Sequence, residues 1–502
     1  MDEITDLKVD TAGIKTDGVE AIEVAFDHED PDNPQEGWSA TKRWRVLAIA
    51  LFITFTSTFN SAAQGSTSKG FRVEHHDVTS EVYLTSNFAY QLMLGVGPLF
   101  LAPLSETYGR RPMLVVLSFI IMLLFLPQAL APNFASILAT RFFQGICGSV
   151  EGPVVAGIVA DLFKKRNRGT AMGTFVVMVY AGNGLGPTCA NWIAYKVNWH
   201  WVYWLQMIMG GVAFLLIFFF LPETRGILIL EKRADALTKE TGKPHYIRGA
   251  DYIELATFAE RVKISLTRPL IYLFTEPIVA IMAMWIGTAW GVVFLLIGAV
   301  AHVFTETYGF NQGSASSILA CGLIGAIFGW FTNEFIQERI YRNAVVKGGG
   351  KAEPEVRLYS SAIGGILFAV GAFGFAGTAR PSVHWIAPAI FITVANFGLY
   401  TVYLATYNYL SDVYDQYSSS AQAAQSLLRG VLGACFPFFG IIMYDKLTFQ
   451  WASTLVGFVA LGFATIPWLM FRYGPTLRAR SKVAVQLSHA EGMVIPDDSP
   501  AV

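Results

Sequence analysis

The stretch Gly173-Thr-Phe-Val-Val-Met-Val-Tyr-Ala-Gly-Asn-Gly-Leu-Gly-Pro187 decides the fold, because it is an apolar, helix-length segment that carries glycines and a proline. A helix inside a bilayer accepts these residues only where a neighbouring helix or a cavity satisfies the freed backbone groups. Gly182 and Gly186 lie four residues apart, so they share a face on which two helix backbones can approach closely. Gly173 lies nine residues before Gly182, which places it roughly on the opposite face. The stretch therefore predicts a closely packed membrane helix.

The composition of the 502-residue chain extends this interpretation to the whole protein. Hydrophobic residues make up 53% of the chain and charged residues only 15%, which is too apolar for a soluble protein of this length. A net charge of −1 provides no basic surface for nucleic acid. The cysteines Cys147, Cys189, Cys321 and Cys435 lie in apolar segments without metal-ligand spacing, so we expect packing residues and neither disulfides nor a metal site.

Apolar segments long enough to cross a bilayer occur twelve times along the chain. A hydrocarbon core of about 30 Å requires roughly 20 apolar residues in a helix. The predicted spans are 44–63, 83–105, 113–132, 135–160, 170–193, 201–222, 271–301, 315–337, 358–378, 383–410, 421–443 and 451–472. The sequence thus predicts an all-α membrane protein with twelve transmembrane helices in two six-helix halves.

A charged stretch separates the two sets of spans. The predicted domains are a disordered tail (1–43), a first half (44–222), a central linker (223–270), a second half (271–473) and a second tail (474–502). Lysine and arginine near the span ends concentrate on the side of the termini and the linker, which the positive-inside rule assigns to the cytosol. The polar N-terminus lacks the apolar core of a cleavable signal peptide.

A charged turn, Glu106-Thr-Tyr-Gly-Arg-Arg111, follows the second predicted span. A carboxylate, then Gly109, then two arginines suits a tight cytosolic turn in which Glu106 faces a helix N-terminus. Arg110 and Arg111 would then hold carbonyls or carboxylates across the two halves, so the turn is a candidate cytosolic gate. The alternative is that the two arginines only satisfy the positive-inside rule.

Arg141, Glu151 and Arg429 lie well inside predicted spans, where a charge is costly and marks function by default. Arg141 and Glu151 are ten residues apart in one span, about 15 Å along the axis, so they cannot pair directly. Glu151 is the first candidate for proton coupling, tuned by Arg141, because a buried carboxyl group can bind a proton reversibly near neutral pH. A structural carboxyl group bonded to backbone or hydroxyl groups is the alternative. Arg429 is a candidate gate residue near the cytosolic third of the eleventh span, or else its side chain reaches the membrane interface.

The tenth predicted span carries a polar aromatic stripe, formed by Asn396, Tyr400, Tyr403 and Tyr407 at i, i+4, i+7 and i+11. Aromatic side chains with polar tips suit a wet cavity that stacks flat organic molecules, although packing between helices is the alternative. Weaker candidates for the same cavity are Tyr180, Asn183, Asn87 and Gln91.

Several of these motifs together resemble one family of membrane transporters. Gly173, Gly182, Gly186 and Pro187 resemble the antiporter motif in the fifth helix of drug:proton antiporters of the major facilitator superfamily. Ala190 and Asn191 stand where the motif usually closes with two glycines.

The other motifs agree with this resemblance. The turn from Glu106 to Arg111 is similar to the superfamily's loop motif in its fungal form, which by resemblance latches the cytosolic side. Arg141 with Gln144 and Gly145 is similar to its fourth-helix motif. Shorter fragments extend the resemblance over residues 33–482 to the fungal twelve-spanner branch of multidrug and polyamine exporters. The second-half counterpart of the loop motif, Glu334 to Arg342, is degenerate, so a symmetric latch is not expected.

The resemblance implies a major facilitator fold whose two halves rock around a midplane cavity. We expect a proton-coupled antiporter that exports small amphipathic organic compounds such as drugs, toxins, secondary metabolites or polyamines. Its expected partners are the substrate, protons and the bilayer, with no nucleic acid and no cofactor beyond the proton gradient. We expect a monomer in the plasma membrane, with a vacuolar or vesicular membrane as the alternative, and both termini in the cytosol.

Other functions remain open from the sequence. A proton-coupled uptake symporter for a nutrient would share the fold, but the fifth-helix pattern is, by resemblance, typical of exporters. A membrane enzyme would need clustered His, Cys or carboxylate residues at one membrane face, and ATP hydrolysis would need a Gly-Lys-Ser/Thr phosphate loop; the sequence contains neither. A non-transporting sensor usually carries a long cytosolic domain, and 223–270 is too short for one.

Overall fold

The computed structural model describes residues 15–16, 19–20, 22–26, 30–164, 168–243, 245–247, 258–349, 352–414 and 418–481. The elements of the first part are β1 (Lys15–Thr16), β2 (Val19–Glu20), β3 (Ile22–Glu23), α1 (Ala40–Ala63), η2 (Gln64–Thr67), α2 (Ser68–Glu74), α3 (Ser80–Tyr108), α4 (Arg110–Ala129), α5 (Phe134–Gly148), α6 (Glu151–Leu162), α7 (Arg168–Lys196) and α8 (His200–Phe220). The linker contains α9 (Gly226–Thr241), β4 (His245–Tyr246) and α11 (Phe258–Thr275). The elements of the second part are α12 (Pro277–Tyr308), α13 (Gln312–Ser317), η4 (Ile318–Ala320), α14 (Cys321–Thr332), η5 (Asn333–Gln337), α15 (Glu338–Lys347), η6 (Pro354–Leu358), α16 (Tyr359–Thr378), α17 (Ile386–Tyr414), α18 (Ser418–Lys446), α19 (Phe449–Phe463) and α20 (Ile466–Arg480).

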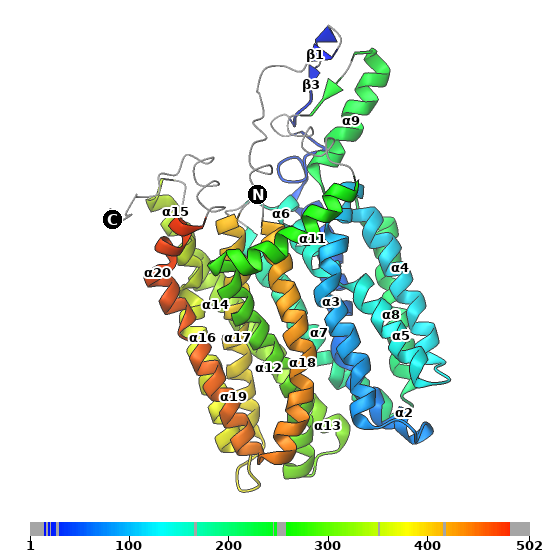
Figure 1. Ribbon diagram of the computed structural model, residues 1–502, viewed down its shortest axis with the longest axis vertical. Coiled ribbons are helices and arrows are strands. Elements are labelled where there is room, and N and C mark those ends of the chain that lie inside the picture. The colour runs from blue at the N-terminus through cyan, green and yellow to red at the C-terminus, as the bar shows by residue number, and fades with distance from the viewer. Residues whose placement is uncertain are drawn as a thin grey trace.

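Long helices run side by side and form one bundle (Figure 1). Among the described residues, ten helical stretches are long and apolar enough to cross a membrane. They are Ala40–Glu74, Arg110–Ala129, Phe134–Leu162, His200–Phe220, Pro277–Tyr308, Gln312–Lys347, Pro354–Thr378, Ile386–Tyr414, Ser420–Tyr444 and Phe449–Arg480. Two more helices of the bundle, α3 and α7, have 29 residues each, and a helix of that length exceeds a hydrocarbon core of about 30 Å. Each of the twelve predicted spans therefore overlaps a helical stretch that is long enough to cross a membrane.

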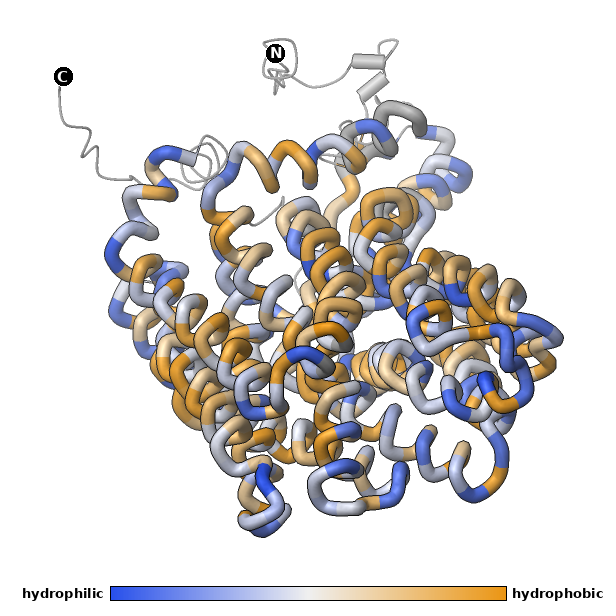
Figure 2. The backbone as a smooth tube through the Cα atoms, turned by 60° about the horizontal axis from the view of Figure 1, so that its bottom comes forward, coloured by the Kyte–Doolittle hydropathy of each residue, from blue (hydrophilic) through white to orange (hydrophobic). Residues whose placement is uncertain are grey.

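The two ends of the bundle carry different elements (Figure 1). Orange, hydrophobic segments predominate along the helices in Figure 2, and blue, hydrophilic residues gather in the turns. One end, here called the linker end, carries α9, α11 and α15, while α2 and α13 lie at the opposite end (Figure 1). Helix α11 lies across the bundle at the linker end and contacts α3, α12 and α18.

The start of the seventh span differs from the prediction. Residues 271–275 were predicted to open that span, but they form the last turn of α11, and α12 begins only at Pro277. Proline lacks a backbone N–H and favours the first position of a helix, so it separates the two helices. The Glu276 carboxylate between them accepts a hydrogen bond from the Tyr414 hydroxyl at 3.2 Å.

Helices α3 and α7 make the main contacts between the two sets of spans. Helix α3 packs against α18, and α7 packs against α13 and α14. At the first crossing, a Cβ atom added to Gly95 would lie 2.8 Å from the Cα atom of Gly430, so the two backbones touch. The remaining space between the sets is available for a cavity.

The fourth predicted span, 135–160, is interrupted in the middle. It consists of α5 and α6, separated at Ser149 and Val150. Pro153 has no N–H to bond the carbonyl of Ser149, which accounts for the break. The interruption makes Glu151 the first residue of α6, and discontinuous helices of this kind line the binding sites of many transporters.

The described parts of the N-terminal segment, which the sequence assigns to a tail over 1–43, contact the linker. Strand β3 pairs in parallel with β4 of the linker, and Val24 is buried against the residues Leu230 and Ile247. The Asp30 carboxylate binds the Arg233 guanidinium of α9 at 2.5 and 3.3 Å. These partners lie some 200 residues further along the chain, so the local composition of the segment does not reveal them. The predicted C-terminal tail lies outside the described residues from 482 onward.

Candidate functional site

Arg141 is a buried cation held by neutral groups of the first half. Its guanidinium donates to the side-chain oxygen of Asn60 at 2.6 Å, to the Asn60 carbonyl at 3.3 Å and to the side-chain oxygen of Asn87 at 3.5 Å. Its carbon atom Cζ lies 4.0 Å from the centre of the Tyr90 ring. These contacts stabilise the charge through dipoles and a cation–π interaction.

Glu151 lies where two cavities meet. One, here called the central cavity, has an empty volume of about 720 Å³ and is lined from both halves by α1, α3, α5, α6, α7, α12, α17 and α18. The other, the first-half cavity, has about 490 Å³ and lies among α1, α3, α4, α5, α6 and α8. Glu151, Ser57 and Gly148 line both cavities. The Glu151 side chain is buried, and its Oε2 atom has no hydrogen-bond partner among the described residues.

Arg429 lines the same central cavity as Glu151, from the other half of the molecule. It donates a hydrogen bond to the Tyr403 hydroxyl at 2.9 Å. Its Cζ atom lies 5.9 Å from the centre of the Trp290 ring. These contacts hold the guanidinium at the central cavity, and the gating role expected from the sequence stays a prediction. The cavity therefore contains one carboxyl group and one guanidinium group from opposite halves.

The structure divides the predicted aromatic stripe of α17. Tyr403 lines the central cavity, whereas the Tyr400 hydroxyl donates to the Gly173 carbonyl of α7 at 3.0 Å and so joins the two halves. The Tyr407 ring packs against Tyr403, with 4.9 Å between the ring centres. Asn396 lines a different cavity. The stripe therefore combines a cavity wall with packing between helices.

Gln91 and Asn183 both line the central cavity, as the sequence suggested. Gln91 also donates from its side-chain nitrogen to the Ser61 hydroxyl at 2.7 Å. Asn87 lies beside Arg141 and is not among the residues that line the central cavity.

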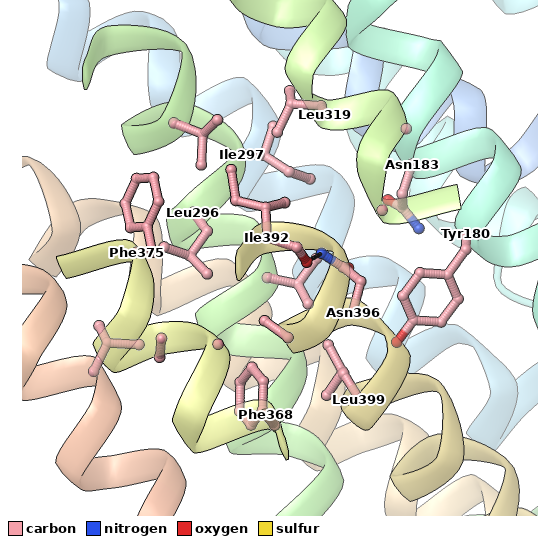
Figure 3. Close-up of a pocket in the computed structure, with 18 of the residues that line it drawn as sticks. Tyr180, Asn183, Leu296, Ile297, Leu319, Phe368, Phe375, Ile392, Asn396 and Leu399 are labelled. Atoms are coloured by element: carbon pink, nitrogen blue, oxygen red, sulfur yellow. Dashed lines mark hydrogen bonds between the residues drawn. The ribbon is translucent and has the colours of Figure 1, made fainter. Parts of the chain in front are cut away.

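A third cavity, here called the second-half cavity, has an empty volume of about 800 Å³ (Figure 3). Figure 3 shows Tyr180 and Asn183 on one side and apolar side chains such as Leu296, Phe368 and Ile392 around the remainder. Asn183 and Trp290 line both this cavity and the central one, so the two spaces meet there. The sequence did not single out Trp290 as a cavity residue. Its position deep in a span, away from the interface where tryptophan is common, could have indicated that role.

The predicted loop motif binds within the first half. The Arg110 Nε atom lies 2.5 Å from the Asp161 carboxylate, and an Arg111 amino group donates to the Phe218 carbonyl at 3.0 Å. Glu223 accepts from the backbone N–H groups of Arg110 and Arg111 at 3.2 and 3.1 Å. The prediction that these arginines hold groups across the two halves was therefore wrong, because acidic partners lie closer, at the end of α6 and after α8.

The turn itself depends on a glycine. Gly109 has a φ angle of 101°, which side chains disfavour. Glu223 occupies the position at the N-terminus of α4 that was expected for Glu106, and the side chain of Glu106 lies outside the described part of the structure. The sequence did not single out Glu223 and Asp161 as partners of this turn, although both are acidic residues next to span ends.

A buried charge cluster at the linker end involves the segment from Glu334 to Arg342, the second-half counterpart of the loop motif. The Arg357 guanidinium donates to Glu338 at 2.8 Å and to Asp412 at 2.9 Å. Its Cζ atom lies 3.3 Å from the centre of the Tyr341 ring. The neighbouring Glu334 accepts a hydrogen bond from the Thr170 hydroxyl in the first turn of α7, at 2.6 Å. This contact joins the halves despite the degenerate motif, and the positive end of the α7 dipole favours it.

The antiporter-type glycines face two different neighbours. Gly182 and Gly186 pack against the backbone of α1 at Phe59, whereas Gly173 faces Tyr400 of the second half. Pro187 lies inside α7. Asn191, which replaces a glycine of the motif, accepts a hydrogen bond from Gln312 of α13 at 2.6 Å. This bond links the halves at the end opposite the linker.

Two sets of membrane-length helices around a cavity with opposite charges are the arrangement of a secondary transporter. The sequence model described as Major Facilitator Superfamily matches residues 47–437. The chain therefore belongs to the Major Facilitator Superfamily and is a multi-pass membrane transporter, not an enzyme. The predicted family, helical membrane fold and class of protein are confirmed.

Known proteins resemble the chain over most of its length. The MFS-type efflux pump MFS2 of Trichophyton rubrum is 34% identical over 456 residues, which are 91% of this chain and 76% of that protein. The multidrug transporter mdrA of Aspergillus fumigatus is 31% identical over 465 residues, with coverages of 92% and 76%. The crystal structure of the human organic anion transporter MFSD10 (TETRAN) superposes with a TM-score of 0.59 at 14% identity, covering 85% of this chain and 99% of that chain. At that identity the last comparison supports the fold alone.

Proposed function

We propose that this transporter exports small amphipathic organic compounds in exchange for protons. The observation that carries the proposal is the position of Glu151, a buried carboxyl group with an unpartnered oxygen at the meeting point of two cavities. Relatives named as an efflux pump and a multidrug transporter support export as the direction. Isolated carboxyl groups at membrane depth are costly, which favours a functional role.

The exchange follows from competition for one carboxyl group. When Glu151 is ionised, the central cavity presents a carboxylate and the Arg429 guanidinium to a substrate that enters from the cytosol. A proton that reaches Glu151 from the opposite side of the membrane neutralises the carboxylate and weakens substrate binding. Arg141 contacts Tyr90, and Tyr90 lines the first-half cavity together with Glu151. Through Tyr90, Arg141 affects the environment of Glu151. Proton and substrate therefore bind alternately.

In this proposal the linker end faces the cytosol, in agreement with its lysine and arginine content. The Arg110–Asp161 pair and the Glu334–Thr170 bond then stabilise the cytosolic side. The Gln312–Asn191 bond stabilises the other side. Alternating access requires that the two bonds between the halves, Glu334–Thr170 and Gln312–Asn191, break in turn, while the Arg110–Asp161 pair stays within the first half. We propose a monomer in the plasma membrane that requires no cofactor beyond the proton gradient.

The test is substrate-induced proton movement in proteoliposomes with an acidic lumen, screened with cationic, neutral and acidic amphipathic compounds. Wild-type protein should couple proton release from the lumen to substrate movement in the opposite direction. Glu151→Gln should abolish the proton movement, because the amide cannot take up a proton. Glu306→Gln, a matched change of an exposed carboxyl group at the outer end of α12, should leave it unchanged.

Two results would contradict the proposal. Movement of substrate and proton in the same direction would identify a symporter. Full proton coupling in Glu151→Gln would remove Glu151 from the mechanism.

A further inference from the structure

The second-half cavity differs from the central cavity in its chemistry. Its lining combines apolar side chains of α12, α16, α17 and α19 with a few polar residues, and includes no charged side chain among the described residues. Its volume of about 800 Å³ lies in the range of pockets that bind drug-sized molecules. It opens toward the central cavity at Asn183 and Trp290. An apolar part of a molecule held in the central cavity can therefore extend into it.

Three residues of the second-half cavity carry an unpartnered buried polar atom, and two of them lie where this cavity meets the central one. The Tyr180 hydroxyl, the Asn183 side-chain oxygen and the Trp290 indole nitrogen have no hydrogen-bond partner among the described residues. Their side chains are 3%, 7% and 3% exposed. Buried polar atoms are normally hydrogen-bonded, so three unpartnered ones in a single cavity lining require an explanation.

The geometry of α7 places two of these groups in the lining of the second-half cavity. Tyr180 and Asn183 are three residues apart and share a helix face, as Figure 3 shows. The Asn183 side-chain nitrogen donates to the Val179 carbonyl at 2.9 Å, which leaves its oxygen as a free acceptor. The indole N–H of Trp290 is a donor, and the Tyr180 hydroxyl can donate or accept. The second-half cavity thus offers donors and an acceptor to one small polar group.

We propose that the second-half cavity is a subsite for the uncharged, apolar body of the substrate, whose hydroxyl or amide group binds Tyr180, Asn183 and Trp290. A hydroxyl or amide group both donates and accepts, which matches the three unpartnered atoms. The absence of a carboxylate from the described lining disfavours polyamines, because each ammonium group would be buried without a counter-charge. This inference rests on the proposed function, since it specifies the class of compound that the transporter carries.

The test measures binding to purified full-length protein without a proton gradient, using 2-naphthol as the hydroxyl-bearing probe and naphthalene as its apolar counterpart. Tyr180→Phe, which removes only the hydroxyl, should weaken 2-naphthol binding about 3- to 10-fold and leave naphthalene binding unchanged. Tyr195→Phe, on the same helix but exposed, is the matched control and should change neither. Val293→Trp, which fills only the second-half cavity, should weaken the binding of both probes. Spermidine should not compete.

Three outcomes would overturn the inference. If neither probe binds wild-type protein, or if spermidine displaces 2-naphthol, the proposed class of compound is wrong. If Tyr180→Phe and Tyr195→Phe bind 2-naphthol equally well, the unpartnered atoms bind only water. If Val293→Trp fails to fold, the Tyr180→Phe result alone decides the question. Because binding needs no proton gradient, a failure of proton exchange with intact binding would refute antiport and leave this subsite standing.

Discussion

Substitution of Gly182 by alanine tests the close packing of α7 against α1. A Cβ atom at this position would lie 2.7 Å from the Phe59 backbone nitrogen and 2.8 Å from the Phe55 carbonyl oxygen, and would also clash with the Thr58 hydroxyl. Ordinary contacts begin at 3.4 Å, so the two helices must separate by about 0.6 Å or more. Both main contacts are backbone atoms, which cannot move aside by changing a side-chain rotamer.

The expected energy follows from two opposing effects. Overpacking a well-packed site costs about 1–3 kcal/mol, and replacing glycine by alanine in a helix regains at most about 1 kcal/mol. Gly182→Ala should therefore lose about 1–2 kcal/mol of stability. Gly298→Ala is the matched control, because its added Cβ meets nothing within 4 Å, and it should equal or exceed the wild type.

The assay is thermal unfolding of the purified variants in one detergent, followed by tryptophan fluorescence and size-exclusion chromatography. The midpoints should fall in the order Gly298→Ala, wild type, Gly182→Ala. Adding Thr58→Ala to Gly182→Ala should restore only part of the loss, since both backbone contacts remain. Equal midpoints for Gly182→Ala and Gly298→Ala would refute the packing argument. Full export by folded Gly182→Ala would show that this glycine serves packing alone.

Two further substitutions test the charged groups at the linker end, each with an exposed control. Arg357→Gln leaves Glu338 and Asp412 without their cation, so we expect the free energy of unfolding to fall by about 3–5 kcal/mol. Thermal unfolding measures this change, and Arg339→Gln, an exposed arginine, should have no effect. Equal unfolding midpoints for the two variants would contradict the buried charge cluster. Asp161→Asn removes the charge facing Arg110 and should lower both stability, by about 1–3 kcal/mol, and the transport rate measured in proteoliposomes. Asp235→Asn, an exposed residue of α9, should change neither stability nor transport rate. Wild-type stability and transport rate in Asp161→Asn would exclude a role for the Arg110–Asp161 pair.

The positions of the spans could be predicted from the sequence because they depend on local composition. An apolar stretch of sufficient length becomes a membrane helix whatever its neighbours are. The boundary of α12 was missed because residues 271–275 are as apolar as a span, and only the turn at Glu276 and Pro277 assigns them to α11. Local composition therefore identifies a helix better than it identifies the helix's ends.

Partners at a distance could not be predicted in the same way. Arg141 and Glu151 were recognised as costly charges, and their separation along α5 and α6 was expected, but the amide oxygens that hold Arg141 come from α1 and α3. The register of Arg429 along its span does not reveal its hydrogen-bond partner, Tyr403 on α17. Each miss concerns a side chain whose environment is built by helices that are far apart in the sequence.

The attachment of the N-terminal segment to α9 changes where this chain should be divided. Residues between α8 and α12 would normally be regarded as a free connector between the halves. Because Asp30 binds Arg233 and β3 pairs with β4, everything up to Ile247 is anchored to the first half. Two co-expressed fragments separated between Ile247 and Phe258 would each retain their own contacts, whereas a division inside α9 would separate β4 from the segment that holds it.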